Sequence, residues 1–383
     1  MASTKEKQPK PPKAAKPPKA AKPPRDFGPI RWLPRALVVV PLLYWILIVI
    51  PGTEKYAAVA ADACIFAIVG LSLNIIIGYT GQLSLGHQGF VGIGAFTAAY
   101  SLTVQKVPFA VTFVLAAVVA ALFALVLGLV ALRITGLYLA LITLVFGLTL
   151  EGSLFEIPRF TNGGAGQPAD RQEFLFEDGN FYLFCLAFLL VACFIDYRLL
   201  KSKTGRALLA LKENERVAEA FGINVTAFKL IAFTLSGAFA GVAGALLAFR
   251  IGIVSGSGFG FFLALTFVLM TVVGGLGSRV GVILGSTLFA VLDFLLTETP
   301  VHGLETFFVK IFSFGIDSAE GNIRQFVPQF IGALGLLLTI TKFRGGIAEQ
   351  IRPLTSWLSG KPFSIHGDAD SGPASVEGSS VRA

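Results

Sequence analysis

Long apolar runs, rather than alternating polar and apolar faces, dominate this sequence. A helix of about 20 apolar residues crosses a lipid bilayer, and runs of this kind recur from residue 36 to residue 342. The pattern predicts an all-α polytopic membrane protein with about ten transmembrane helices. The predicted spans are 36–51, 57–78, 84–103, 108–132, 136–155, 180–199, 230–250, 261–277, 280–296 and 326–342.

Glycine is concentrated inside these spans. Fourteen of the 42 glycines gather in "GYTGQLSLGHQGFVGIGAF", "SGAFAGVAGALLAF" and "VVGGLGSRVGVILGS". Small residues at helical spacing let helix backbones approach closely and also permit unwound turns. We therefore expect broken or closely packed helices, above all in the third span and around Gly274–Gly281.

The Lys/Arg content of the loops predicts the orientation of the spans. Residues 196–229 contain seven basic and four acidic residues, whereas 156–179 contain two and five, and 297–324 contain two and four. Basic loops stay on the cytoplasmic side of a membrane. The sequence thus predicts a cytoplasmic 196–229 loop, two external acidic loops, and N and C termini that are both cytoplasmic.

The net charge of +8 comes from the N-terminal tail alone. Residues 1–35 hold ten Lys/Arg and two acidic residues, which leaves 21 of each sign in the remainder. Its "KPPKAA" repeats favour an extended, solvated chain. We predict a disordered basic cytoplasmic tail at 1–35, a transmembrane domain at 36–343 and a cytoplasmic C-terminal tail at 344–383. The basic tail either attracts anionic membrane lipids or an acidic partner, or, as we favour, enforces the positive-inside orientation; it does not indicate nucleic acid binding.

Motifs for catalysis and nucleotide binding are absent from the sequence. The apolar runs contain no HExxH, paired Asp or Ser/His arrangement, and no G-x-x-x-x-G-K-[ST] phosphate loop occurs. The histidines, which lack the spacing of metal ligands, are His87, His302 and His366. The sequence therefore predicts no enzyme activity, no metal site and no cofactor bound by this chain.

Charged residues are scarce within the spans. Transporters driven by proton or sodium gradients usually place acidic residues in the middle of the membrane. Only Asp62 and Asp293 are candidates for such a role. An ion-coupled secondary transporter therefore stays open as an alternative. So does a non-transporting membrane scaffold, which would leave the polar segment described next unexplained.

A polar segment interrupts the apolar pattern at residues 78–90. Non-helical backbone within a membrane persists only where it is buried in protein or lines a wet cavity. We predict a bend or broken helix here, beside a translocation path for a polar solute. Alternatively, these groups only hydrogen-bond neighbouring helices, as a lone histidine usually does. The side chains concerned are Tyr79, Gln82, Ser84, His87 and Gln88.

The basic 196–229 loop contains the pattern of a short amphipathic helix. Asn214 suits its N-cap and Gly222 the position just past its end. Val217 and Phe221 share one face. A helix of about two turns is not stable alone, so it must lie against a groove on another protein or against its own helical bundle.

Three segments resemble the LivM-type permeases of the LivH/LivM family, the membrane subunits of branched-chain amino acid ABC importers. They are "GLSLNIIIGYTGQLSLGHQGFVGIGAFTA", "GRALLALKENERVAEAFGINVTAFKLIAFTLSGAFAGVAGAL" and "VVGGLGSRVGVILGS", and they occur in the order of the family. With the spans between them they cover roughly Ala57 to Phe343. The stretches "SRVGVILG", "TNGGAGQPA" and "TKFRGGIAE" depart from the family pattern. Related permeases carry urea and short amides, so that substrate class stays an alternative to leucine, isoleucine and valine.

The resemblance implies a multi-pass permease of the bacterial inner membrane that has no ATPase of its own. The expected partners are a LivH-like permease paralogue, two ABC ATPase subunits that hydrolyse the ATP, a periplasmic solute-binding protein and membrane lipids. The second segment would contain the helix that docks on an ATPase. Its residues would be Arg206, Lys212, Glu215, Val217, Glu219, Phe221 and Gly222.

Overall fold

A computed structural model gives the architecture of the chain. The chain divides into two units, 1–43 and 44–383, and all the residues described here belong to the second unit. The structure describes residues 46, 49–131, 134, 136–159, 161–162, 165–297, 334 and 346–349. The predicted first and last spans and the two predicted tails lie almost entirely outside these residues.

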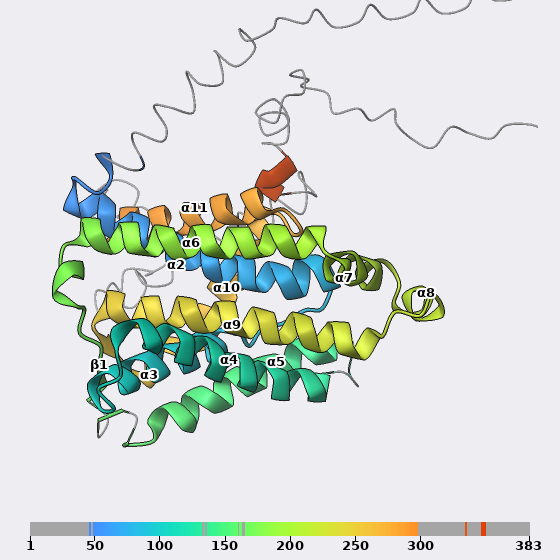
Figure 1. Cartoon of the computed structure of the whole chain (residues 1–383), viewed down its shortest axis with the longest axis horizontal. Coiled ribbons are helices and arrows are strands. Elements are labelled where there is room, and N and C mark those ends of the chain that lie inside the picture. Colours follow the sequence, from blue (N-terminus) through green and yellow to red (C-terminus); the bar gives the residue numbers. More distant parts are fainter. Residues whose placement is uncertain are drawn as a thin grey trace, which may run out of the picture. The chain divides into compact units, whose positions relative to one another are not determined.

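Helices make up most of this part of the chain (Figure 1). The α-helices are α2 (Glu54–Leu73), α3 (His87–Thr103), α4 (Phe109–Ala131), α5 (Leu137–Gly152), α6 (Asp178–Lys201), α7 (Lys203–Glu213), α8 (Glu215–Ala220), α9 (Val225–Ile251), α10 (Phe261–Gly274) and α11 (Arg279–Thr297). A π-helical turn, η3 (Asn74–Gly78), follows α2, and three short 3₁₀ turns are η4 (Leu154–Glu156), η5 (Glu173–Leu175) and η6 (Gly256–Phe259). Two short strands, β1 (Gln167–Pro168) and β2 (Ile253–Val254), pair antiparallel.

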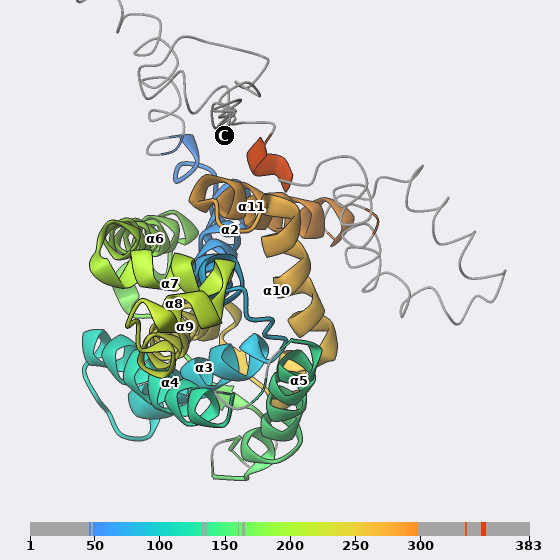
Figure 2. The same cartoon turned by 90° about the vertical axis from the view of Figure 1, so that its right-hand side faces the viewer.

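Helix α2 occupies the middle of the bundle. It packs against α6, α9, α10 and α11, and Figure 2 shows these helices around it. A second group forms where α3 packs against α4, α5 and α9. Helix α9 contacts both groups, because it packs along α2, α3 and α4. The small helices α7 and α8 lie at one end of the bundle, and the β1–β2 pair lies at the other (Figure 1).

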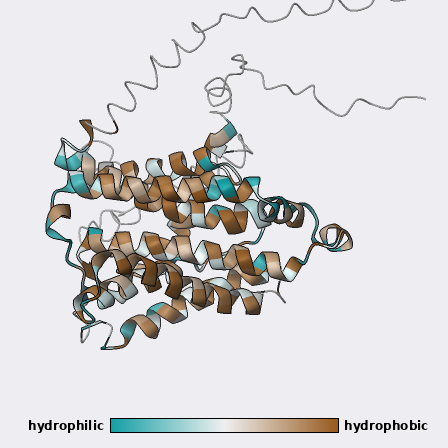
Figure 3. Ribbon diagram, viewed as in Figure 1, coloured by the Kyte–Doolittle hydropathy of each residue, from teal (hydrophilic) through white to brown (hydrophobic). Residues whose placement is uncertain are grey.

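The hydropathy of the helices fits a membrane environment. Among the described residues, six helical segments are long and apolar enough to cross a membrane. The ribbon is mainly brown along these helices, and teal positions gather near their ends and in the loops (Figure 3). The all-α polytopic prediction is thus confirmed. The six segments are Glu54–Gly78, Phe109–Val130, Leu137–Glu156, Asp178–Lys201, Val225–Ile251 and Gly256–Gly274.

Glycines permit very close packing between α3, α4 and α9. A Cβ atom added to Gly94 of α3 would lie 2.2 Å from the carbonyl oxygen of Gly241 in α9. One added to Gly241 would lie 2.4 Å from the carbonyl oxygen of Ala116 in α4. Backbone atoms of three helices therefore meet where any side chain would collide. The expectation of closely packed, glycine-rich helices is confirmed here.

Candidate functional site: the polar break and the loop helices

The predicted polar segment contains a break in helical structure. Helical backbone continues from α2 through η3 to Thr80, residues 81–86 are non-helical, and α3 begins at His87. Gly81 has a φ of +71°, a conformation that suits glycine. Burial then alternates as in an extended strand: Gln82 and Ser84 are buried, whereas Leu83 is 41% exposed. Two polar side chains are thereby directed into the protein at the break.

His87 binds three helical elements together through its ring. Its Nε2 lies 3.0 Å from Ser72 Oγ of α2 and 2.8 Å from Ser236 Oγ of α9. Its Nδ1 lies 3.2 Å from Ser84 Oγ in the break. The two helices are joined further, because Ser72 Oγ donates to the Ser236 carbonyl oxygen and Ser236 Oγ donates to the Ser72 carbonyl oxygen. His87 is 1% exposed, so the ring serves as a buried helix-to-helix contact.

Gln88 differs from His87, its neighbour in sequence. Its side chain is fully buried, yet neither its Oε1 nor its Nε2 has a hydrogen-bond partner among the described residues. The amide lies against Gly147 of α5, where an added Cβ would come 2.2 Å from Nε2. Gln82 Oε1 is also buried and has no partner in the part of the chain that the structure describes. A buried amide with no partner is costly, so these groups are the natural candidates to meet a passing polar solute.

Tyr79 belongs to a second polar group at the end of α2. Its hydroxyl donates to Asp196 Oδ2 of α6, over 3.1 Å. The same carboxylate oxygen lies 2.6 Å from Nε of Arg279, the first residue of α11. The Arg279 guanidinium also lies over the ring of Tyr197, 5.1 Å from its centroid. Because the Asp196 side chain is fully buried, this ion pair fixes α6 and α11 against the end of α2.

Two further hydrogen bonds complete this group. The π-helical turn η3 begins at Asn74, just before the break. The Asn74 side-chain Oδ1 accepts a hydrogen bond of 2.7 Å from the backbone N–H of Gly277. The amino group of Lys212 in α7 donates to the Gly78 carbonyl oxygen over 2.8 Å. We call the set the junction cluster. It comprises Asn74, Gly78, Tyr79, Asp196, Lys212, Gly277 and Arg279.

Helix α8 forms as its sequence predicts. Asn214 Oδ1 accepts from the backbone N–H groups of Arg216 and Val217, over 3.0 and 3.2 Å, and so caps the helix start. Gly222 follows the helix end with a φ of +80°. The helix rests on its own chain through buried Ala218 and through an ion pair of 2.8 Å between Glu215 and Lys229 of α9.

Large apolar groups are exposed on α8 and at its C-terminal end. Phe221 is 82% exposed and Val217 is 50% exposed. Arg206 and Glu219 are also exposed. Lys212, which the sequence grouped with them, instead reaches back to the Gly78 carbonyl oxygen. The structure thus separates the predicted coupling residues. Arg206 of α7 and Val217, Glu219 and Phe221 at α8 are exposed, Glu215 pairs with Lys229 of α9, and Lys212 of α7 makes an inward contact.

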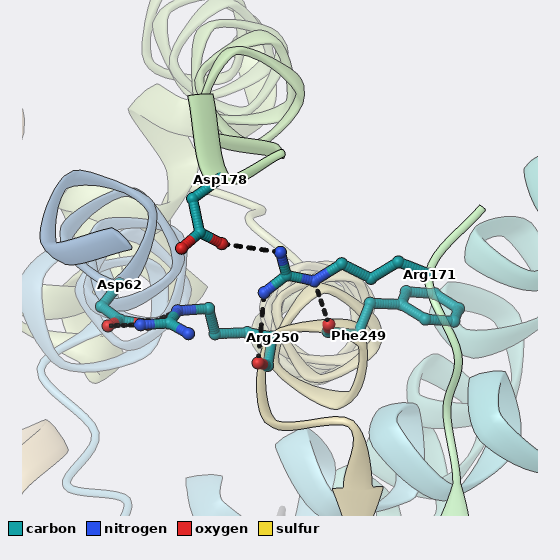
Figure 4. Close-up of polar contacts among 5 residues, drawn as sticks. All are labelled: Asp62, Arg171, Asp178, Phe249 and Arg250. Carbon is teal, nitrogen blue, oxygen red and sulfur yellow. Dashed lines mark hydrogen bonds and ion pairs between the residues drawn. The ribbon is translucent and has the colours of Figure 1, made fainter. Parts of the chain in front are cut away.

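Asp62, a candidate for ion coupling, is engaged in an ion pair (Figure 4). Arg250 near the end of α9 donates from Nε to Asp62 Oδ1 over 2.9 Å and from Nη2 to Oδ2 over 3.1 Å. Beside it, Arg171 binds the Phe249 carbonyl oxygen and Asp178 Oδ1, each over 2.7 Å. This arrangement favours a structural role for Asp62, because its charge is already neutralised. Asp293, the other candidate, lies in α11.

The sequence reasoning missed several residues that form these contacts. Ser72, Asn74 and Ser236 stand alone in apolar runs, and such isolated polar positions within spans are a usable signal for interhelical hydrogen bonds. Asp196 and Arg279 sit at span ends, where sequence does not reveal that they pair. Helix α7 was also missed. Two sequence features could have predicted this helix. Ser202 caps its start, where the Ser202 hydroxyl accepts from the Gly205 N–H over 3.2 Å, and its buried residues, Ala207, Leu208 and Leu211, have helical spacing.

Fold and site together define a polytopic α-helical membrane protein with a buried polar break between α2 and α3. Residues 56–316 match the family described as "Branched-chain amino acid transport system / permease component". The chain therefore belongs to this permease family. No solved structure matches it.

Curated relatives agree with the family. The chain is 34% identical over 267 residues to the high-affinity branched-chain amino acid transport system permease protein LivM of Salmonella typhimurium, which covers 61% of each chain. It is 33% identical over 281 residues to LivM of Escherichia coli, covering 64% of each. A probable branched-chain amino acid transport permease protein LivH of Methanocaldococcus jannaschii is 36% identical over 117 residues, which is 30% of this chain and 36% of the relative. The chain thus spans less than two thirds of the length of the two LivM relatives it matches.

Proposed function

We propose that this protein is a permease subunit of an ATP-driven importer that moves branched-chain amino acids across the inner membrane of a bacterium. The observation that carries the proposal is the family match over residues 56–316, combined with a helical bundle that contains a buried, uncharged polar break. In this account the ATP is hydrolysed by separate subunits. The chain itself supplies the membrane route and binds no cofactor.

The proposed topology has ten spans with both termini in the cytoplasm. The basic 196–229 loop, which forms α7 and α8, would then face the cytoplasm. The acidic 156–179 segment, with Arg171 and Asp178 beside the end of α9, would face the periplasm. Helices α7 and α8 lie at one end of the bundle and β1 lies at the other (Figure 1). This arrangement supports the proposed orientation.

The proposed route for the solute passes the break at residues 81–86. The Gln88 amide and Gln82 Oε1 are buried and have no hydrogen-bond partner among the described residues, so they can exchange hydrogen bonds with a moving solute. His87 and Ser84 hold the break in place through bonds to α2 and α9. A zwitterionic amino acid carries both charges, so an uncharged polar lining suits it better than a fixed carboxylate or ammonium group would.

Helix α8 is proposed to dock on an ATPase subunit. Phe221 and Val217 offer an exposed apolar pair on a short, capped helix at one end of the bundle. Such a pair suits insertion into an apolar groove on another protein. Arg206 and Glu219 would lie at the rim of the contact. A LivH-like permease, a second ATPase and a periplasmic binding protein would complete the assembly.

The docking role is tested with the double variant V217S/F221S. Co-purification of the permease with the ATPases encoded beside it, and ATP-driven leucine uptake in reconstituted vesicles, are both measured. We expect both to be lost, because an exposed pair contributes little to the fold but much to a docked interface. Normal co-purification and uptake would refute the assignment.

A matched control uses another exposed apolar residue near the same loop. Leu209 of α7 is 40% exposed and lies outside the proposed contact, so L209S should retain co-purification and uptake. Equal losses in L209S and V217S/F221S would show that any polar change in this region is harmful, and would remove the support for a specific docking face.

A further inference from the structure

A cavity of about 400 Å³ lies between α3, α4 and η4, apart from the polar break. Its volume falls within the range of about 300–1,000 Å³ that is typical of small-molecule sites. Its lining is mostly apolar and aromatic, and includes Ile93, Phe96, Val119, Phe123 and Phe155. Phe96 and Phe155 are stacked, with ring centroids 4.8 Å apart. The cavity therefore favours a hydrocarbon ligand.

The depth of the cavity corresponds to about one leaflet of a bilayer. The lining residues Ile93 and Ser101 are eight positions apart on α3, and Leu115 and Phe123 are eight positions apart on α4. At about 1.5 Å per residue, each pair spans about 12 Å along its helix. Half of a hydrocarbon core of about 30 Å is about 15 Å. A single acyl chain standing parallel to the helices matches this length.

Polar groups are gathered at the end of the cavity near the C-terminus of α3. Tyr100 and Gln105 line the cavity there. The Tyr100 hydroxyl accepts a hydrogen bond from Nε of Arg159 over 3.3 Å, and Arg159 is exposed. A guanidinium group beside the polar end of an apolar cavity is complementary to the phosphate of a lipid headgroup.

The apolar character of the lining argues against a zwitterionic solute in this cavity. Most lining residues are aliphatic or aromatic, so the two charged groups of an amino acid would find few hydrogen-bond partners along it. None of the described lining residues is acidic, so no side chain of the lining would repel a lipid phosphate. Glu156 is close in sequence to the lining residue Phe155, but its carboxylate lies beside Gly256. The surroundings are apolar as well, because Val118 and Leu122 of α4 are 51% and 55% exposed. An anionic lipid satisfies all of these features.

We propose that this cavity binds one acyl chain of an anionic membrane phospholipid, with the lipid phosphate held by Arg159. The test uses the full chain purified in mild detergent, stripped of lipid and then incubated with phosphatidylglycerol. Native mass spectrometry measures the retained lipid. We expect one tightly held phosphatidylglycerol per chain. An indole at position 119 fills the cavity, so V119W should lower retention by about tenfold.

The matched control is V118W, whose new side chain is directed outward from the neighbouring position of α4. It should retain lipid as the wild type does, with the same thermal unfolding midpoint. The variant R159Q should lose the preference for phosphatidylglycerol over phosphatidylethanolamine. In the unaltered chain, a phosphatidylglycerol with a photoreactive acyl group should label peptides of α3 and α4, which tests the site without any substitution.

Several results would overturn the proposal. They are retention in V119W equal to that of the wild type, equal loss in V118W, or photolabelling spread evenly over all the helices. Displacement of the lipid by free leucine would assign the cavity to the solute, and displacement by oleate but not by phosphatidylethanolamine would assign it to a free fatty acid.

Discussion

The side-chain amino group of Lys212 lies 2.8 Å from the carbonyl oxygen of Gly78. This hydrogen bond joins α7 to the π-helical turn at the end of α2, immediately before the polar break. The neighbouring Gly277 in the α10–α11 turn is bound to Asn74 of the same π-helical turn over 2.7 Å. A displacement of α7–α8 by a docked ATPase would therefore act directly on the segment that begins the proposed solute route.

Replacing Lys212 should separate ATP hydrolysis from transport. The K212M variant keeps the aliphatic stem and removes the charged donor, whose hydrogen bond contributes about 1.5–3 kcal/mol. Uptake should fall by about tenfold, while the ATPases stay attached and active, because the docking residues on α8 are untouched. Uptake and ATP hydrolysis in reconstituted vesicles measure both effects.

The control for this prediction is K203M, at an exposed lysine in the first turn of the same helix. It should behave as the wild type. A parallel fall of hydrolysis and uptake in K212M would contradict the separation, because it would mean that Lys212 contributes to docking rather than to transmission.

The Asp62–Arg250 pair should be structural and not part of ion coupling. The two side chains are 31% and 26% exposed, so a single variant, D62N or R250Q, should cost about 1 kcal/mol of stability. The double variant D62N/R250Q should lose less stability than the two single variants lose together, because neither charge is then left without its partner. Thermal unfolding measures the energies. ATP-driven uptake should persist in the folded double variant, whereas an ion-coupled carrier would lose transport with Asp62.

The contact between α3, α4 and α9 should tolerate no side chain at Gly241. A Cβ there would lie 2.4 Å from the Ala116 carbonyl oxygen and 2.6 Å from Ala120 Cβ, so G241A should destabilise the protein by about 1–3 kcal/mol. At Gly152 of α5, an added Cβ has no neighbour within 4 Å among the described residues, and G152A is the matched control. Thermal unfolding of the two variants should differ clearly. Equal unfolding midpoints would show that the helices can separate at little cost.

Gln88 and His87 should respond differently to substitution. Q88M replaces an amide that has no partner with an apolar group of similar shape, so stability should stay the same or rise, whereas uptake should fall. H87A removes the bonds to Ser72, Ser84 and Ser236, so stability and uptake should fall together. The unfolding midpoints and uptake rates of Q88M and H87A measure these two effects. Unchanged uptake in Q88M would exclude that side chain from the route.

Local sequence patterns predicted the local structure well. Six of the predicted spans coincide with helical segments long and apolar enough to cross a membrane, because each such helix needs its own apolar run. The start and end of α8 were recognisable because Asn214 and Gly222 act within their own helix turn. Boundaries were less accurate. In the region predicted as the third span, helix α3 begins at His87 rather than at residue 84, because the preceding segment is extended.

Contacts between distant residues could not be predicted in the same way. Tyr79, Asp196 and Arg279 are brought together only by the packing of α2, α6 and α11. Lys212 was grouped with the docking residues because it is near them in sequence, and only the fold shows that its amino group meets Gly78. The same holds for His87, whose partners lie on α2 and α9. For the polar segment at 78–90 the sequence offered hydrogen bonds to neighbouring helices as one alternative, but it did not show which residues would be the partners.

Solute accumulation in sealed vesicles tests the central claim most directly. The chain is reconstituted with its neighbouring permease and ATPases, with the periplasmic binding protein added, and labelled leucine is followed with urea and short amides as competitors. We expect leucine to accumulate only when ATP is supplied on the cytoplasmic side, with valine and isoleucine competing and urea not. Accumulation driven by a proton or sodium gradient without ATP would contradict the account.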